Sequence, residues 1–144
     1  MKIEDPNIAM ESFDHLHEVK VKIDYDKWVE TVETNLEYFT WLENTEEGKN
    51  RMARIDEIPE KFQDKIRKIH SKSQALAEYD PDKGFHLVRL AFNSEYGTIG
   101  TTYQKEITKD DLNMLLMLAN KLNALLLNNG NQIITPEFVE TYKS

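Results

Sequence analysis

The sequence predicts a single α+β domain over residues 1–144, with an antiparallel sheet of about four strands and long helices packed on one of its faces. Three observations lead to this fold class. Stretches of alternating polar and apolar residues occur separately from stretches with an apolar residue every three or four positions, so both strands and helices are expected. Two strand-like stretches, 85–92 and 98–107, follow one another closely, as in a β-hairpin. A hydrophobic content of 40% in 144 residues is enough for one core.

The first 23 residues are expected to form a loose arm followed by a strand. Residues 1–12 show little pattern, which predicts a loose N-terminal arm or a short helical turn. Between Phe13 and Ile23 the side chains of Val19, Val21 and Ile23 alternate with charged residues, the pattern of a half-buried strand. We therefore expect the first strand of the sheet in this segment.

The middle of the chain predicts two helices. Apolar residues at helical spacing predict the first over about 26–44. A polar segment, 45–58, is expected to begin as a loop, and Met52, Ala53 and Ile55 could form one short helical turn in it. Pro59 is well placed to begin a second helix, because its missing N–H is not needed in the first turn. This helix would run over 59–79 and end at the turn-forming residues 80–84.

The C-terminal part predicts the hairpin already mentioned, a long helix and a short strand. Thr108 is followed three residues later by an aspartate, the spacing of a capping box. A helix is expected over 109–128, because apolar residues cover much of its circumference and an Asn-Asn-Gly sequence closes it. A short strand at 132–135 and a final helical turn at 135–142 follow.

The predicted element order is β-α-α-β-β-α-β, with the final turn of helix after it. When the helix at 59–79 is set aside, this order becomes the ferredoxin-like β-α-β-β-α-β arrangement. The alternative is a layer of helices covering a simpler antiparallel meander.

Charge and composition exclude several classes of function. The net charge of −8 and the pI near 5 argue against nucleic-acid binding. No apolar run approaches the length of a membrane span, and the N-terminal residues lack the layout of a secretory signal, so a cytoplasmic protein without membrane contact is expected. The absence of cysteine excludes thiolate metal sites and cysteine nucleophiles.

Histidines provide the only candidates for a metal site. His15 and His17 would share one face of the strand expected there, and His86 could approach from another strand. No acidic residue stands at a motif-defining distance, so we expect no metal and no cofactor. The alternative is an enzyme that binds a small ligand or a metal in a pocket between the helices and the sheet.

Surplus apolar residues predict surfaces that bind protein. Two aromatic residues lie away from the centre of the apolar stripe on the helix 26–44. The helix 109–128 carries a second apolar stripe, which predicts a homodimer; burial of this stripe within the same chain is the alternative. The candidate interface residues are Tyr38, Trp41, Met114, Leu118 and Leu125.

Charged ridges flank the apolar stripes of two predicted helices. The basic ridge consists of Lys61, Lys65, Lys68 and Lys72, and the acidic ridge consists of Asp26, Glu30, Glu33 and Glu37. Such ridges are solvated helix faces or sites for partners of opposite charge. We therefore expect a non-enzymatic protein–protein interaction module. Its size and acidity are similar to those of toxin-neutralising immunity proteins of bacteria, an analogy of general properties alone.

Overall fold

The computed structural model describes residues 1–143, which form one antiparallel sheet of seven strands and five α-helices. The strands are β1 (Pro6–Ala9), β2 (Thr40–Trp41), β3 (Gln74–Asp80), β4 (Phe85–Asn93), β5 (Thr98–Tyr103), β6 (Leu125–Asn128) and β7 (Gln132–Ile133). Their order across the sheet is β2-β3-β4-β5-β1-β6-β7. The expected sheet of about four strands, and with it the ferredoxin-like order, is wrong. Four of the seven strands have only two to four residues, too few to show an alternating pattern.

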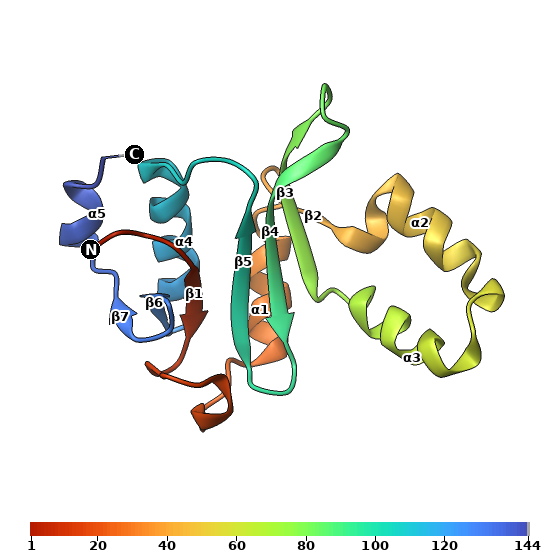
Figure 1. The fold of residues 1–144 in the computed structure, drawn as a ribbon, viewed down its shortest axis with the longest axis horizontal. Coiled ribbons are helices and arrows are strands. Elements are labelled where there is room, and N and C mark those ends of the chain that lie inside the picture. The colour runs from red at the N-terminus through yellow and green to blue at the C-terminus, as the bar shows by residue number, and fades with distance from the viewer. Residues whose placement is uncertain (144) are drawn as a thin grey trace.

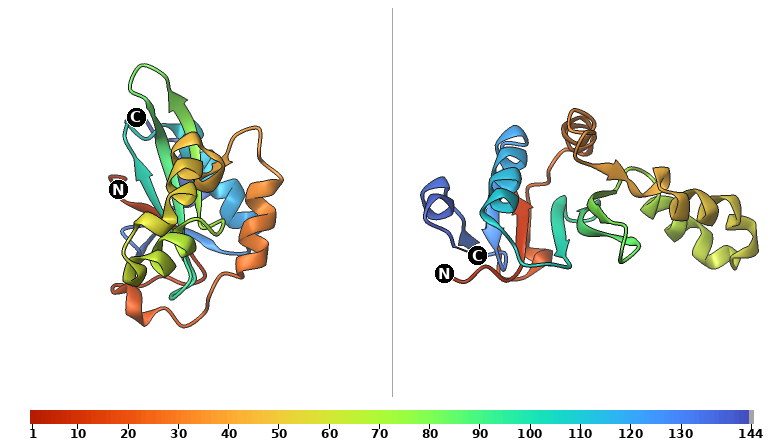
Figure 2. Two further views of the ribbon diagram at one scale, coloured as in Figure 1. Left: turned by 90° about the vertical axis from the view of Figure 1, so that its right-hand side faces the viewer. Right: turned by 90° about the horizontal axis from the view of Figure 1, so that it is seen from above.

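Helices lie on one face of the sheet and beyond one of its edges. The helices are α1 (Tyr25–Glu33), α2 (Glu46–Ala53), α3 (Glu60–Ile69), α4 (Lys109–Lys121) and α5 (Pro136–Glu140), and the single 3₁₀ turns are η1 (Leu16–Glu18), η2 (Leu42–Asn44) and η3 (Ile55–Glu57). Figure 2 shows α1 and α4 on the same face of the sheet, with α5 beside α4. The helices α2 and α3 instead project sideways, next to β2 and β3 (Figure 1).

The hydrophobic core fills the space between the sheet and the helices α1 and α4. Trp28 of α1 is fully buried and stacks on Phe92 of β4, with 6.0 Å between the ring centroids. Leu112 and Leu118 of α4 are also fully buried, as is Ile99 of β5. Side chains therefore occupy the helix–sheet interface, where the enzyme alternative places a pocket, and the cavities described below lie elsewhere.

The strand β1 occupies the middle of the sheet. Ile8 lies opposite Ile99 of β5 on one side and opposite Leu126 of β6 on the other. All four residues of β1 are buried. The loose arm expected over 1–12 is therefore wrong. Four residues beginning with a proline carry no periodicity, and only pairing with distant strands makes them a strand.

The strand expected between Phe13 and Ile23 is also wrong. Regular structure in this segment is limited to the turn η1, and Val21 is exposed. The carboxylate of Glu11 accepts hydrogen bonds from the backbone N–H groups of Lys20 and Val21, at 3.3 and 3.2 Å. A side chain thus satisfies backbone donors that a neighbouring strand would otherwise pair.

Both helices expected in the middle of the chain are too long, and the loop expected at 45–58 contains α2. The first helix ends at Glu33, after which Thr40 begins β2. The second ends at Ile69, and Lys72, with a φ of 54°, turns the chain into β3. The apolar spacing of the helix continues by coincidence into the strand, which explains the error.

The helix expected over 109–128 is a helix followed by a strand. The capping box is confirmed: the Thr108 hydroxyl accepts from the N–H of Asp111, and the Asp111 carboxylate accepts from the N–H of Thr108 at 2.8 Å. The helix ends at Lys121, and Asn123, with a φ of 54°, leads into β6. The leucines of β6 are therefore extended and pair with β1.

The expected hairpin is confirmed. The strands β4 and β5 pair from Val88 opposite Tyr103 to Asn93 opposite Thr98, although β5 is four residues shorter than the expected 98–107. These pairings form within a few residues of one turn, which is why the sequence shows them clearly.

Candidate functional site: a helical arm and its groove

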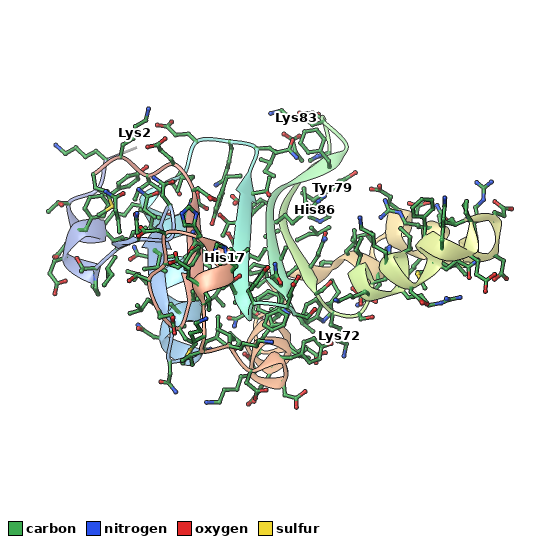
Figure 3. All side chains as sticks on the ribbon, turned by 60° about the horizontal axis from the view of Figure 1, so that its bottom comes forward. Lys2, His17, Lys72, Tyr79, Lys83 and His86 are labelled. Carbon is green, nitrogen blue, oxygen red and sulfur yellow. The ribbon has the colours of Figure 1, made fainter. Side chains whose placement is uncertain are left out.

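The three candidate metal ligands do not converge. The rings of His15 and His17 stack at 5.7 Å, whereas His86 lies in β4 beside Tyr79, with 5.0 Å between those two ring centroids. Figure 3 shows His17 and His86 in different parts of the molecule. Within residues 1–143, no three His, Asp or Glu side chains are placed to hold a metal ion.

The five candidate interface residues do not form one surface. Trp41 and Leu118 are buried in the core of their own chain, with exposed fractions of 1% and 0%. Tyr38 and Met114 are partly buried and pack against this core. Leu125 is partly buried and lies in β6 rather than on a helix. The second stripe expected on the helix 109–128 therefore belongs mainly to the core, which removes the reason to expect a dimer there.

A helical arm is the part of the fold that extends farthest from the sheet, and we define it as residues 42–72 (Figure 1). The hydrophobic core described above contains no residue of this arm. At its start, the hydroxyl of Thr45 caps α2 by accepting a hydrogen bond from the N–H of Gly48 at 3.0 Å. A Cβ atom on Gly48 would lie within 2.9 Å of the Leu42 carbonyl carbon, so α2 contacts η2 too closely for any side chain.

The other end of the arm is held by α1 and η2. The hydroxyl of Tyr25 donates to the Ser71 carbonyl at 2.7 Å, and the indole N–H of Trp28 donates to the Lys72 carbonyl at 2.9 Å. The carboxylate of Glu43 accepts from the backbone N–H of Lys72 at 2.6 Å. Three hydrogen bonds between residues far apart in sequence therefore fix the base of the arm.

The apolar side of α3 is only partly covered by its own chain, because Ile66 and Ile69 are half-buried. None of its residues is buried, and Phe62 is 47% exposed. The ammonium group of Lys61 lies 5.1 Å from the centroid of the Phe62 ring, a cation–π distance. The predicted basic ridge does lie along α3, except that Lys72 follows the helix and pairs with Glu33 of α1 at 3.4 Å.

His70 lies at the base of the arm and is almost fully buried, with 8% of its surface exposed. Neither of its ring nitrogens has a hydrogen-bond partner among the described residues. Burial lowers the pKa of His70, the nearby Arg51 lowers it further, and Glu43 opposes these effects. The neutral imidazole is therefore the form that the folded arm favours.

The hairpin groove is a cavity of about 830 Å³ between α2 and the β3–β4 hairpin. Residues that line it include Thr45, Arg51, Leu76, Tyr79, Phe85 and His86. Tyr79 and Phe85 remain 57% and 39% exposed. Arg51 is held by an ion pair with Glu47 at 3.0 Å, and burial lowers the pKa of His86.

A strained residue turns the hairpin wall toward the groove. Glu78 has a φ of 55°, a conformation that non-glycine residues seldom adopt. Its carboxylate lies 3.0 Å from the ammonium of Lys105, which also pairs with the buried Asp111 at 2.9 Å. In a regular strand, side chains three positions apart point to opposite faces of the sheet. Leu76 and Tyr79 nevertheless both line the groove, because the strand changes direction at Glu78, whose side chain faces this cluster.

The cluster around Glu78 is a tightly connected ionic network. Burial alone would lower the pKa of Lys105, but hydrogen bonds to Asp111 and Glu78 raise it above its ordinary value. Burial, followed by the charge of Glu78, raises the pKa of Tyr38 to about 12. Lys105 is therefore protonated and Tyr38 neutral at neutral pH, and the two ion pairs of Lys105 support the hairpin wall.

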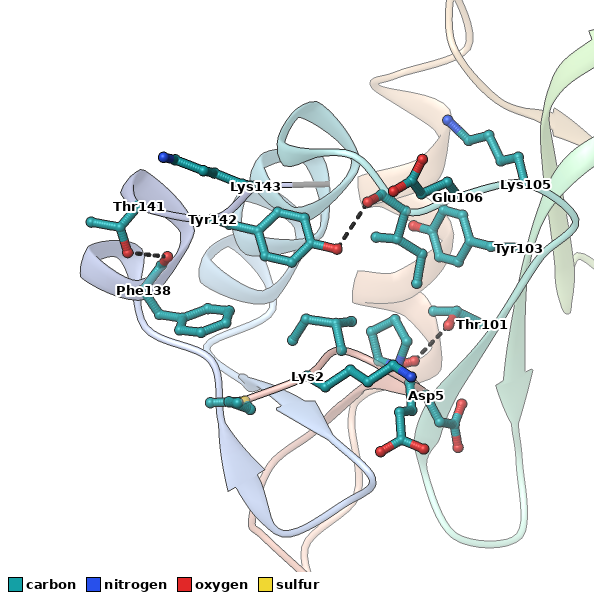
Figure 4. Close-up of a pocket in the computed structure, with 15 residues that line it drawn as sticks. Lys2, Asp5, Thr101, Tyr103, Lys105, Glu106, Phe138, Thr141, Tyr142 and Lys143 are labelled. Carbon is teal, nitrogen blue, oxygen red and sulfur yellow. Dashed lines mark hydrogen bonds between the residues drawn. The ribbon is translucent and has the colours of Figure 1, made fainter.

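A separate cavity of about 670 Å³ lies where the N-terminal residues meet β5 and α5 (Figure 4). The hydroxyl of Tyr142 donates to the Ile107 carbonyl at 3.0 Å and closes one side of it. Side chains of both charge signs line it, including Lys2, Asp5 and Glu106. Burial raises the pKa of Asp5.

The sequence does not predict the hairpin groove, because apolar residues at helical spacing place Tyr79 at the end of a helix. The turn residues 80–84 lie between two stretches rich in apolar residues, and this arrangement was the signal for a second hairpin. Phe85 was correctly expected at the start of a strand, but nothing in the sequence indicated that α2 lies opposite it.

No family model, curated protein or solved structure matches this chain. Within the described part of the chain, no helix is both long enough and apolar enough to cross a membrane. The hairpin groove, with its exposed aromatic residues, is the feature of the fold best suited to binding.

Proposed function

We propose that this chain is a non-enzymatic protein–protein interaction module that binds a segment of a partner protein in the hairpin groove. The observation that carries this proposal is the exposure of Tyr79 and Phe85 on the wall of a groove of about 830 Å³. Aromatic side chains are enriched at the centres of protein interfaces and contribute much of their binding energy.

Both walls of the groove are held in place before any partner binds. The Glu43–Lys72 and Thr45–Gly48 hydrogen bonds fix the arm, and the ionic network around Lys105 fixes the hairpin. A preformed groove spends little of its binding energy on ordering side chains and loops. Rigid walls therefore support a role in recognition.

The chemistry of the groove fits a short peptide segment. Leu76 and Ile69 provide apolar surface, while Arg51, His86 and Gln104 provide polar groups around it. An apolar side chain of the partner would contact the leucine and isoleucine, and the polar groups would satisfy the partner's backbone. This combination of an apolar centre and a polar rim is that of typical interfaces.

Photo-crosslinking tests the proposal directly. A photoreactive phenylalanine derivative placed at position 85 is expected to form a discrete covalent adduct with a second protein in an extract of the source cells. The same group at position 36 is the control, because Leu36 is more exposed than Phe85, at 50% against 39%, and does not line the groove. Adducts at both positions, or at neither, would contradict the proposal.

A competition experiment identifies the groove as the binding site. Unlabelled wild-type protein is expected to suppress the adduct, and a Tyr79→Ser variant is expected to compete roughly tenfold less well or worse, as for a typical hot-spot residue. Leu36→Ser should compete as well as the wild type. If the only adduct contains a second copy of this chain, the groove mediates self-association, and the proposed separate partner is ruled out.

A further inference from the structure

Another cavity, of about 390 Å³, lies between α3 and the β4–β5 turn. We call it the lysine pocket. Residues that line it include Tyr25, Lys65, Lys68, Ile69, Phe92 and Asn93. Its volume is that of a small-molecule site. It shares Ile69 and Gln74 with the hairpin groove, and its other lining residues differ.

The lysine pocket carries unbalanced positive charge. Within residues 1–143, no carboxylate lies within 4.0 Å of the ammonium of Lys65 or Lys68, and Glu95 is the only acid among the residues that line the cavity. The segment 61–72 has five basic residues and one acidic residue, in a chain whose net charge is −8. Two free cations side by side in an acidic protein mark a place where an anion is favoured.

The neutral groups of the pocket add hydrogen-bond donors and an apolar surface. The side-chain oxygen of Asn93 accepts from the N–H groups of Glu95 and Tyr96, so its NH₂ group remains as a donor. Phe92 and Tyr25 meet edge to face at 5.7 Å and, together with Ile69, form an apolar surface beside the lysines.

We propose that the lysine pocket binds a phosphate monoester whose organic part is flat and apolar. A phosphate monoester carries about −1.5 to −2 charges at pH 7, which two lysines balance, whereas a single carboxylate would leave one lysine unbalanced. The organic part lies against Phe92, Tyr25 and Ile69. The site is independent of the hairpin groove, and its ligand is a small molecule rather than a protein.

Calorimetric titration with phenyl phosphate at low salt tests this proposal on the whole chain. We expect saturable binding by the wild type, with amide NMR shifts at residues 65–74 and 92–95. The variant Lys65→Gln/Lys68→Gln should bind roughly tenfold more weakly or worse, because two charge-assisted contacts are lost. The control Lys61→Gln lies on the same helix outside the pocket and should bind like the wild type.

Two further probes separate the charge from the organic part. Inorganic phosphate and phenol are each expected to bind more weakly than phenyl phosphate. Equal binding of inorganic phosphate would overturn the apolar contact, and equal binding of phenol would overturn the role of the lysines. The proposal also fails when phenyl phosphate shows no saturation up to roughly 10 mM. It fails likewise when the Lys65→Gln/Lys68→Gln variant binds phenyl phosphate as well as the Lys61→Gln control does. Crosslinking at position 85 tests the hairpin groove separately.

Discussion

Replacing Gly48 with alanine is expected to detach α2 from the preceding turn while leaving the sheet intact. The added Cβ atom would meet the Leu42 carbonyl group and the Glu43 Cα atom, the latter at 3.0 Å. All of these atoms are backbone, so no change of rotamer relieves the overlap, and α2 itself must move. The hydrogen bond from the N–H of Gly48 to Thr45, which caps the helix, would be strained at the same time.

The size of the effect follows from two opposing contributions. Forcing an extra methyl group into a packed site costs about 1–3 kcal/mol. Alanine in place of glycine in a helix returns at most about 1 kcal/mol. With a mid-range cost of about 2 kcal/mol, the net loss for opening α2 is about 1–2 kcal/mol, a factor of roughly 5–30 in the population of the open form. Because the arm contributes nothing to the described core, this loss is local.

Native-state hydrogen exchange measures both the size and the place of the effect. Exchange of the α2 amides is expected to accelerate by roughly 5–30-fold, while the amides of β4 and β5 keep their wild-type rates. Gly100→Ala is the matched control, because a Cβ atom there would meet nothing within 4 Å. Unchanged exchange in α2, or equal acceleration in the control, would refute this account of the arm.

Two more perturbations test the arm base and the ionic network. The unfolding free energy is expected to fall as the pH drops below about 6.5, because the lowered pKa of His70 lets the unfolded chain take up the proton first. In urea titrations, the unfolding free energy of the His70→Gln variant should fall less at low pH than that of the wild type. The same pH dependence in both proteins would contradict the role of His70. Lys105→Met should cost about 2–4 kcal/mol by leaving Asp111 and Glu78 unpaired. Lys72→Met removes an exposed pair and should cost about 0–1 kcal/mol, so equal losses would contradict the role of burial.

The parts of the fold that the sequence predicted correctly depend on interactions within a few residues. The capping box at Thr108 is complete within four residues, and the β4–β5 hairpin closes through one short turn. The strand β1 is the opposite case, because its pairing partners lie about 90 and 120 residues away. No pattern inside four residues could indicate that distance.

The sequence predicts helices that are too long, because the residues that end them give weak signals. Asn123 and Lys72 both adopt positive φ and end the helical segments, and of these only asparagine is a recognised residue for that conformation. The candidate site was missed for a different reason. The amphipathic pattern of α3 correctly indicated a helix, but a pattern cannot show whether the same chain covers its apolar side.

The central position of β1 has a consequence for synthesis of the chain. The strands β5 and β6 do not pair with each other, and Asn7 lies between Gly100 and Leu127. A ribosome adds about 5–20 residues per second, so β1 leaves it roughly 6–24 s before β6. During this interval β2 to β5 can assemble and β1 can pair with β5, but the other edge of β1 stays unpaired until β6 is made. The first strand to be made therefore ends up between two strands that are made late, β5 and β6. Until β6 leaves the ribosome, one edge of β1 must stay free of other partners.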